Sequence, residues 1–574
     1  MVEELCFLPM PASGLKSRAR SKVAPMREVV TRVNRAISAI RQLWAGQLDD
    51  DLLTTTEWPA KTMSPNGQQA ADHLLQTIGS AIQRKPPNAP VGAAALRRQR
   101  GAGNYSLSPS ATKTSAIPKR GDIWPADIAA IALPPGDIQP VSLASTSRRA
   151  GELLNNYEKT MLKTSTERKQ ILKKQAESAE IPYVDPNIQK GIYELALRMA
   201  MGKMLAGVSQ PMSTVGLFTV VKKILECGAI VLRLVFDQRI PNTLWQEPKW
   251  APLSGPGALS SIDLSVEARD NPLTHLEVAT GDIPDYYYRL GLPLGMAKWF
   301  CLPNVEVGKL CDMLKEKGEH DIADRLMAEA GGKRSGSVGL QVPPMGWSWA
   351  VVLAQFNIQD VIMTTTLDGK LILTPERCIT EGAPPPQIST EIRVAHYEYI
   401  DDYGLLVLTT GESENLRIRL AQAVRDHLTA NGFPVHKEVG GEEMVSLGHV
   451  IGGRPPLVMP AEEKLWLAVE CLWELGRGGQ GLPAQVESVV SLSTWMMMVR
   501  RGALSVYAET YDWIRVHREE KAIRQIPKEV RRELMAVSAL LPLSRQELTA
   551  PWFDTVFMFD ASDTGAGVCE TPAS

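Results

Sequence analysis

The sequence predicts an α+β fold in which helices pack against a mostly antiparallel β-sheet. From about residue 181 onward, short apolar runs alternate with stretches of helical periodicity, without the regular strand–helix–strand rhythm of a parallel sheet. Residues 215–237 contain two β-rich runs that flank the turn-forming residues Glu226, Cys227 and Gly228. This pattern is typical of a β-hairpin, and it favours the antiparallel arrangement.

The composition argues against several classes of protein. The formal net charge of -2 gives no general attraction to nucleic acid, so a basic surface would have to come from local clustering. The seven cysteines show neither CxxC nor Cys/His spacing, so we expect no disulfide framework, no zinc site and a reducing compartment. No apolar run is long enough to span a membrane, and the first ten residues lack the basic start of a secretory signal. We therefore expect an intracellular chain, in the nucleus or the cytoplasm, without a membrane partner.

The N-terminal third has little of the apolar density that a folded core needs. Within residues 1–83, only 27–45 show helical spacing of apolar residues, which predicts one amphipathic helix. Residues 84–149 are rich in Pro, Ala, Gly and Ser and are basic, and residues 151–180 are charged and helical in character. We interpret 84–180 as a solvated linker followed by a helix, with contact to phosphate backbones as the alternative.

The remaining elements follow from periodicity. Strands are expected within 276–283, 393–400 and 403–408, and helices within 305–330 and 414–430. Residues 461–540 are mainly helical, and a last strand is expected at 556–560, after which the pattern stops. The expected domains are 181–460, 461–545 and 551–574.

Two acidic segments carry the chemistry. In Tyr399-Ile400-Asp401-Asp402, adjacent carboxylates lie between apolar stretches, which predicts a tight turn between two strands. Burial of both carboxylates without a cation would be very unfavourable, so the turn is either solvated or binds metal. Asp282 follows another short strand, and carboxylates from two strands can together hold two Mg²⁺ ions, with Mn²⁺ as an alternative.

Seven segments occur in a characteristic order along the chain. They are residues 232–242 (LRLVFDQRIPN), 282–288 (DIPDYYY), 344–348 (PMGWS), 399–402 (YIDD), 432–437 (GFPVHK), 446–451 (SLGHVI) and 559–567 (FDASDTGAG). In this order they resemble the reverse transcriptase family over roughly residues 210–570. The stretches between them look most like retroelement polymerases of protists and dinoflagellates.

The resemblance implies a right-hand polymerase, with fingers and palm in 181–460 and a helical thumb and connection in 461–545. It implies an RNA-directed DNA polymerase that acts on a template with a primer and on dNTPs, in an undetermined oligomeric state. Residues 551–574 resemble the opening strand of an RNase H module, of whose carboxylates only Asp560 is present. We expect that piece to be unable to fold or cut by itself.

The resemblance also implies roles for individual residues. Asp282 and Asp401 would be metal ligands, and Asp402 a supporting carboxylate. Tyr287 would lie under the sugar and exclude a 2′-hydroxyl, with a core tyrosine as the alternative. Arg233 would hold triphosphate oxygens, a task suited to a planar guanidinium.

Further positions of the nucleotide pocket are implied in the same way. Lys222 or Lys223 would assist Arg233, although a surface cation is the alternative for each lysine. Asp285 would contribute its backbone, and Gly346 would permit close approach of a base pair. Met345 stands where many relatives have glutamine, which removes an amide from the pocket. Lys437 would be a general acid for pyrophosphate, although its spacing from the preceding glycine is short.

Nucleic acid would be contacted by Tyr399, Gly448, Arg500 and Arg501, with an ordinary solvated helix face as the alternative for the two arginines. His396 and His449 are interpreted as structural histidines without a partner cluster. The rival to a polymerase is a decayed or domesticated retroelement protein that binds nucleic acid without polymerising. The DNA-templated or telomerase-like alternative lacks a recognisable accessory RNA-binding domain.

Overall fold

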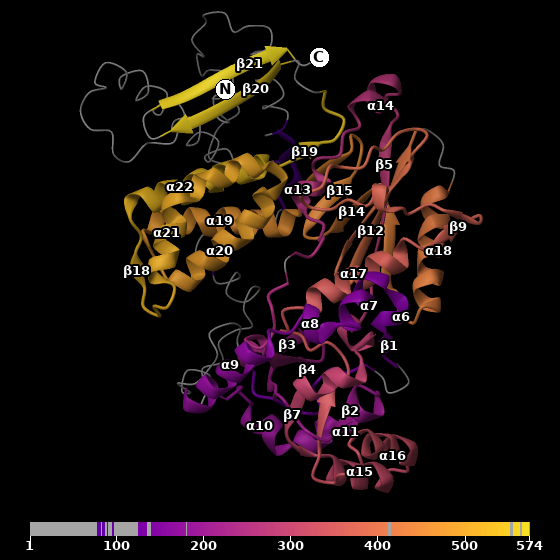
Figure 1. Ribbon diagram of the computed structural model, residues 1–574. Helices are drawn as coiled ribbons and strands as arrows, with labels where there is room; N and C mark the ends of the chain where they lie inside the picture. Colours follow the sequence, from indigo (N-terminus) through magenta and orange to yellow (C-terminus); the bar gives the residue numbers. More distant parts are fainter. Residues whose placement is uncertain are drawn as a thin grey trace, which may run out of the picture.

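A computed structural model describes residues 124–134, 139–178, 181–248, 250–410 and 415–551, short stretches between 77 and 96, and the strands 555–562 and 565–572. The helix predicted at 27–45 lies outside the described residues. The fold mixes helices and mostly antiparallel sheets, as predicted (Figure 1). In the described part of the chain, no helix combines the length and the apolar character needed to cross a bilayer.

A four-stranded antiparallel sheet forms the centre of the molecule. Its strands, in spatial order, are β11 (Val394–Tyr399), β12 (Asp402–Thr409), β5 (His275–Asp282) and β13 (His436–Gly441). The helices α17 (Ala350–Ile362) and α18 (Leu416–Ala430) pack against it. Leu405 and Val407 of β12 join one hydrophobic cluster, and Leu406 and Leu408 join another. Both faces of this strand are therefore buried, which explains its continuous apolar sequence.

A second group of elements precedes and follows β5 in the chain. The predicted hairpin at 215–237 is confirmed as β3 and β4, which pair antiparallel. Below them in Figure 1, a three-stranded sheet is covered by helices. The elements of this group are β2 (Leu205–Val208), β3 (Gly216–Ile224), β4 (Ile230–Asp237), β7 (Cys301–Glu306), β8 (Ser337–Leu340), α10 (Pro186–Lys190), α11 (Ile192–Met201), α15 (Val307–Glu316) and α16 (His320–Glu329).

Short elements connect these two groups. They are α12 (Arg239–Asn242), α13 (Pro256–Leu259), α14 (Ser265–Asp270), η2 (Tyr286–Arg289), β6 (Leu290–Gly291), η3 (Leu294–Trp299), β9 (Thr366–Leu367), β10 (Lys370–Leu371) and η4 (Pro375–Arg377). Three residues separate the end of β5 from the 3₁₀ helix η2, and Asp285, which directly precedes this helix, has a left-handed backbone.

The interpretation of 84–149 as a solvated linker is wrong for residues 124–134 and 139–149. The Trp124 amide donates to the Thr219 carbonyl at 2.9 Å, and the Ala132 amide donates to the Leu232 carbonyl at 2.8 Å, so this segment lies along the β3–β4 hairpin. The segment continues into β1 (Val141–Ser142), α6 (Leu143–Thr146), α7 (Arg148–Leu154), α8 (Tyr157–Thr160) and α9 (Ser165–Ser178). Leu143 is fully buried. Widely spaced apolar residues suffice here because the existing sheet edge supplies hydrogen bonds.

The C-terminal part is mainly helical, as predicted for 461–540. The stripe Trp466, Leu467, Val469 and Leu472 is buried in its core. A small antiparallel sheet, in the order β14-β15-β16-β19, lies between these helices and the central sheet (Figure 1). The elements are β14 (Glu443–Ser446), β15 (His449–Gly452), β16 (Leu457–Pro460), α19 (Glu462–Gly478), β17 (Gln480–Gly481), α20 (Pro483–Met497), η5 (Met498–Tyr507), α21 (Ala508–His517), β18 (Arg524–Gln525), α22 (Lys528–Leu540), η6 (Leu541–Leu543) and β19 (Gln546–Glu547).

The strand predicted at 556–560 lies within β20 (Thr555–Ser562), but the expectation of a single strand is wrong. A second strand, β21 (Gly565–Pro572), pairs with β20 in an antiparallel hairpin. Its two glycines and its proline give β21 a poor intrinsic preference for strand. Pairing with β20 supplies the backbone hydrogen bonds that this sequence alone would not predict.

Candidate functional site: a carboxylate cluster at the end of the central sheet

Three carboxylates that are distant in sequence meet at one end of the central sheet. Asp282 is the last residue of β5 and Asp402 is the first residue of β12, and the two are direct partners in the antiparallel register. Directly opposed residues of such a pair have Cβ atoms about 4.5–5.5 Å apart. The Ile283 amide donates to the Asp401 carbonyl at 3.0 Å, which places Asp401 beside the same strand end. The predicted partnership of Asp282 with the 401–402 pair is thus present in the fold.

The turn that carries Asp401 has an unfavourable backbone conformation at Ile400, whose φ is 63°. A β-branched residue rarely adopts this left-handed conformation, so the surrounding structure must hold it. Gln355 of α17 does so, because its Oε1 accepts from the Ile400 amide at 2.8 Å. Its Nε2 donates to the carbonyls of Glu398 and Pro252, both at 3.0 Å.

Gln355 was not predicted from the sequence, although a signal was present. The helix sequence AVVLAQFNIQDVI places Gln355, Asn357 and Gln359 among apolar residues, and all three are buried. Buried amides in an apolar helix need specific partners. Such a pattern therefore indicates side chains that hold neighbouring segments in place.

The electrostatics of the cluster are those of like charges held close together. Desolvation raises the pKa of Asp402 to about 6, and the carboxylates of Asp401 and Asp282 contribute to the rise, whereas the Lys437 ammonium opposes it. Desolvation also raises the pKa of the Asp401 carboxyl group, although Asp401 as a whole residue is exposed. The nearby Asp282 carboxylate adds to that rise, and the Arg233 guanidinium opposes it. A cation bound among the three would relieve their mutual repulsion.

The donor set fits hard divalent cations. All three side chains offer carboxylate oxygens, which are the ligands that Mg²⁺ prefers and that Mn²⁺ also accepts. The carboxylates come from a strand end and a turn, so open positions remain for water or a substrate. Asp282, Asp401 and Asp402 are therefore the residues that can hold such ions.

The three consecutive tyrosines after Asp282 differ in exposure. Tyr286 and Tyr288 are buried, at 2% and 4% exposure, and only Tyr287 is half-buried. The Tyr286 hydroxyl donates to the Ala354 carbonyl at 3.1 Å, and Tyr286 belongs to the hydrophobic core. Burial raises the pKa of Tyr287, and the Asp401 carboxylate raises it further, which places its phenol near that carboxylate. Exposure thus favours Tyr287 as the residue that faces the site, as its position had suggested.

Two basic residues of the β3–β4 hairpin interact with acidic residues predicted for the site, Lys222 with Asp285 and Arg233 with Asp401. The Lys222 ammonium lies 3.0 Å from the Asp285 carboxylate, and Asp285 has a left-handed backbone with a φ of 54°. Arg233 is exposed, it lowers the pKa of Asp401, and among the described residues it has no ion-pair partner. Lys223 is exposed and is not brought to the site by any contact within the described ranges. Of the two lysines, Lys222 is the one in contact with a predicted site residue, and the nucleotide-binding role of each stays a prediction.

Gly346 lies in a turn that no other residue would fit. Its φ is 109°, and a Cβ at this position would lie 2.7 Å from the Phe236 carbonyl oxygen. Asn242 fixes this turn, because its side-chain amide donates to the Gly346 carbonyl at 2.8 Å and its Oδ1 accepts from the Ser348 amide at 3.1 Å. Met345 beside it is half-buried and packs against the main core. Gly346 itself is exposed, so a ligand can approach its backbone.

Lys437 occupies an irregularity in β13. The register of β13 against β5 shifts between His436 and Val439, and Lys437 there has a φ of 54°. Such a bulge redirects a side chain. The Lys437 ammonium lowers the pKa of Asp402, which places it near that carboxylate, and its role as a general acid stays a prediction.

Tyr399 and Gly448 are linked through a residue that was not singled out in the sequence. The Trp495 indole of α20 donates to the Leu447 carbonyl at 2.8 Å and packs edge-on against the Tyr399 ring, with centroids 6.2 Å apart. A Cβ on Gly448, whose φ is 76°, would lie 3.7 Å from the same indole nitrogen. Trp495 therefore joins the C-terminal helices to the strand that leads into the carboxylate turn.

The two arginines predicted to bind nucleic acid are otherwise engaged. The Arg501 guanidinium lies 2.5 Å from the Glu381 carboxylate, and the Arg500 guanidinium donates to the Arg545 carbonyl at 2.9 Å. Both lie on η5, which packs against α13 and β16. No contact within the described residues brings either arginine to the carboxylate cluster.

His449 fits the structural interpretation, since it donates to the Leu447 carbonyl at 3.1 Å and packs on Trp495. For His396 the interpretation is wrong in one respect. His396 does have a partner cluster, made by Cys378 and Glu398, which the linear spacing of these residues conceals.

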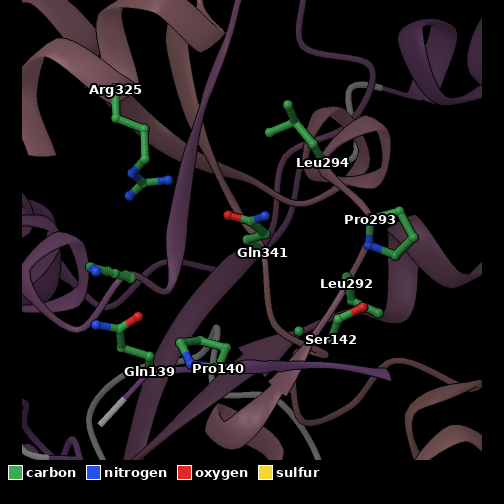
Figure 2. Close-up of a pocket in the computed structure, with 10 residues that line it drawn as sticks. Gln139, Pro140, Ser142, Leu292, Pro293, Leu294, Arg325 and Gln341 are labelled. Carbon is green, nitrogen blue, oxygen red and sulfur yellow. The ribbon is translucent and has the colours of Figure 1, made fainter. Parts of the chain in front are cut away.

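A separate pocket of about 390 Å³ is lined by residues of β1 and β6, among others. Figure 2 shows Gln139 and Pro140 along one edge and Arg325 and Leu294 along the other. Arg325 is paired with Glu329 at 3.0 Å and also donates to the Leu205 carbonyl. None of the predicted site residues lines this pocket.

No protein-family model and no curated protein matches this sequence. Among the solved structures that match this chain, two are of a foamy viral protease-reverse transcriptase. One is of the dRH form in complex with double-stranded DNA, at 12% identity and a TM-score of 0.38, over 69% of this chain and 60% of that chain. The other is in complex with an RNA/DNA hybrid, at 12% identity and a TM-score of 0.37, over 69% of this chain and 46% of that chain.

Proposed function

We propose that this protein is an RNA-directed DNA polymerase whose reaction centre is Asp282, Asp401 and Asp402. The observation that carries the proposal is the direct cross-strand pairing of Asp282 with Asp402, with Asp401 in the adjoining turn. The order of the seven sequence segments supports it, and so does the position of Tyr287, Arg233 and Lys222 around the same strand ends. Nucleotidyl transfer needs this combination of clustered carboxylates and nearby cations.

The carboxylates would hold two Mg²⁺ ions, or Mn²⁺ in their place, which when bound supply activation of the primer hydroxyl and charge stabilisation at the leaving oxygen. The chain's own residues do the remaining work. Arg233, exposed and without an ion-pair partner among the described residues, would bind triphosphate oxygens through its planar guanidinium. Lys222 would neutralise a second phosphate once it leaves Asp285. The carboxylate turn would be held in position by Gln355.

Selection of the substrate would rest on two positions. Tyr287, the half-buried member of the three tyrosines, would lie under the sugar and clash with a 2′-hydroxyl, which favours dNTPs. Gly346, exposed and without a Cβ, would let the nascent base pair approach the backbone. Lys437, held beside Asp402 by the bulge in β13, would donate the proton that the departing pyrophosphate requires.

In this proposal the β3–β4 hairpin belongs to the fingers, the central sheet to the palm, and α19–α22 to the thumb. The thumb would meet the palm at Trp495, whose contacts with Tyr399 and Leu447 lie next to Gly448. A primer bound along this junction would pass Tyr399 on its way to Asp401. Because Arg500 and Arg501 are engaged with protein groups, they would contribute to nucleic-acid binding only after those contacts open.

Primer extension on poly(rA)/oligo(dT) with Mg²⁺ and dTTP tests the proposal. The wild-type chain should extend the primer, and Asp401→Asn should not. Asp324→Asn, which changes an exposed carboxylate paired with Lys315, is the matched control and should extend normally. Equal extension by wild type and Asp401→Asn would contradict the proposal. Binding of the primer–template by a wild-type chain that never extends it would instead support the non-polymerising alternative.

A further inference from the structure

A second polar cluster lies on β11, outside the carboxylate site. Two of its residues, His396 and Glu398, are two positions apart and therefore lie on the same face of the strand. The third, Cys378, comes from a segment that runs parallel to β11, where the Ile379 amide donates to the His396 carbonyl at 2.7 Å. The candidate ligand atoms of the three residues all lie within 4.8 Å of one another. The side chains of His396 and Glu398 have no solvent exposure.

The hydrogen bonds of His396 fix the positions of its protons. Its Nε2 lies 3.0 Å from the Thr374 carbonyl oxygen, which can only accept, so Nε2 carries a hydrogen. In the neutral imidazole the lone pair is then on Nδ1, which lies 2.6 Å from Oε1 of Glu398. Two lone pairs at this distance repel each other. A cation, either a proton or a metal ion, must therefore lie between His396 and Glu398.

The surroundings of Cys378 suit a thiolate. The Gln359 amide donates to its Sγ at 3.6 Å, and Oε2 of Glu398 lies 3.4 Å from the same sulfur. In the absence of a cation, burial and the Glu398 carboxylate raise the pKa of the Cys378 thiol, so the sulfur keeps its proton. A divalent ion at this position would remove that proton and take the thiolate as a ligand.

Charge balance admits both kinds of cation, since an imidazolium, a carboxylate and a neutral thiol also carry no net charge, so the types of donor distinguish them. A thiolate, a carboxylate and a neutral imidazole carry two negative charges together, which one divalent ion neutralises. Because a net charge is very unfavourable beside side chains without solvent exposure, such as those of His396 and Glu398, this neutral set is a good match for burial. The mixture of sulfur, nitrogen and oxygen donors is typical of zinc rather than of magnesium. A metal-bound histidine also commonly donates its other N–H to a backbone carbonyl, as His396 does to Thr374.

We propose that Cys378, His396 and Glu398 form a binding site for a zinc-class divalent metal ion. Zinc bonds of about 2.0–2.3 Å require His396 and Glu398 to move apart slightly and Cys378 to approach them, which small side-chain rotations achieve. Thr380, whose hydroxyl lies 3.5 Å from the sulfur, or a water molecule would complete a tetrahedral set. The ion ties the segment before β11 to the strand that ends at the carboxylate turn. The expectation of no zinc site, based on cysteine spacing, is replaced by this proposal.

The proposal is independent of polymerase activity and is tested on metal content. Full-length protein purified with zinc present and then desalted should contain about one zinc per chain, and Cys378→Ser should contain little. Cys311→Ser is the matched control, because Cys311 is also buried but its sulfur donates to the Ala323 carbonyl instead. This control should retain the zinc, and so should Asp401→Asn, since it alters only the other cluster.

Cobalt substitution of the wild-type chain keeps the test decisive even where Cys378→Ser fails to fold. Zinc-free wild-type protein titrated with Co²⁺ should develop the near-ultraviolet absorption of a thiolate–cobalt bond and the visible bands of a tetrahedral ion. Glu398→Gln should weaken Co²⁺ binding by about 10-fold or more. A wild-type chain that holds no zinc and shows no thiolate–cobalt absorption would overturn the proposal, leaving a proton as the cation between His396 and Glu398.

Discussion

The strand β11 connects two polar clusters that differ in nearly every physical respect. At its end, Asp401 and Asp402 meet Asp282, three carboxylates of like charge in a site that is open to solvent at Asp401. Within the strand, His396 and Glu398 meet Cys378 in a mixed cluster whose histidine and carboxylate have no exposure. The first cluster stores repulsion that an incoming cation relieves. The second is balanced and holds two segments together.

One side chain connects the two clusters. Gln355 donates to the Glu398 carbonyl in the buried cluster and accepts from the Ile400 amide in the carboxylate turn. The strained turn is therefore supported from the same helix that covers the buried cluster. The carboxylate turn can remain open and electrostatically unfavourable because the strand before it, β11, is fixed.

The largest expected effect is a loss of activity without a loss of stability, at Asp282. Asp282→Asn should reduce the rate of primer extension by about 10³-fold or more, because it removes a cation ligand from the reaction centre. The melting temperature should not fall, since the change also removes one of three repelling charges. Primer-extension assays and thermal unfolding on the same preparation check the predicted rate and the predicted melting temperature. A stable variant with full activity would show that Asp282 has no part in catalysis.

In the buried cluster, by contrast, a substitution should lower the stability of the fold. His396→Leu leaves the Glu398 carboxylate buried without its partner, so in metal-free buffer the free energy of unfolding should fall by about 3–5 kcal/mol. His320→Leu, at an exposed position of α16, is the control and should change it little. Denaturant unfolding measures the difference. If His396→Leu were as stable as wild type, the cluster would not hold the segment before β11.

Two neighbouring lysines of β3 should differ in their effect on the KM for dTTP. Lys222→Ala should raise the KM for dTTP on the order of 10-fold, because Lys222 lies beside Asp285 at the carboxylate end of the sheet. Lys223→Ala, one residue further along β3, should leave KM nearly unchanged, since Lys223 is exposed and no contact among the described residues brings it to Asp285. Steady-state kinetics of both variants decide the matter. Equal effects would mean that the hairpin acts through its overall charge alone.

The smallest effect is a pH dependence of opposite sign to the usual carboxylate. Folding raises the pKa of Asp402 from its ordinary value of 3.8 to about 6, so in this window the folded chain binds more protons than the unfolded chain. The contribution of Asp402 to stability is therefore favourable below pH 4 and is lost as the pH rises through 6. In metal-free buffer, Asp402→Asn should raise the melting temperature at pH 7.5, and less at pH 5. Addition of Mg²⁺ at pH 7.5 should stabilise the wild type more than the variant.

The sequence predicted the features that are encoded locally. The β3–β4 hairpin follows from two β-rich runs around a Gly turn, and the partnership of Asp282 with Asp401 follows from strands that end in acidic residues. Its position among the three tyrosines pointed to Tyr287 as the residue that faces the site, and Tyr287 is the one of the three that is not fully buried. The signals for the hairpin and for Tyr287 lie within a few residues of the feature, whereas the partnership of Asp282 with Asp401 rests on the order of the acidic segments along the chain.

Features that depend on distant contacts were not predicted. Residues 124–132 are ordered along a sheet edge that supplies hydrogen bonds, which their own composition does not reveal. The buried cluster joins Cys378 to His396 through a parallel bridge, so no metal-ligand spacing is visible in the chain. Trp495 reaches the Leu447 carbonyl from a different helix, and only the packing of that helix reveals it.

The most direct test of the central claim is to locate the cations. A structure of the protein with an RNA template, a DNA primer, a non-hydrolysable dNTP and Mn²⁺ should show anomalous scattering within about 2.5 Å of carboxylate oxygens of both Asp282 and Asp401. The triphosphate should lie against Arg233. Manganese that contacts neither carboxylate, with the nucleotide bound elsewhere on the chain, would contradict the account.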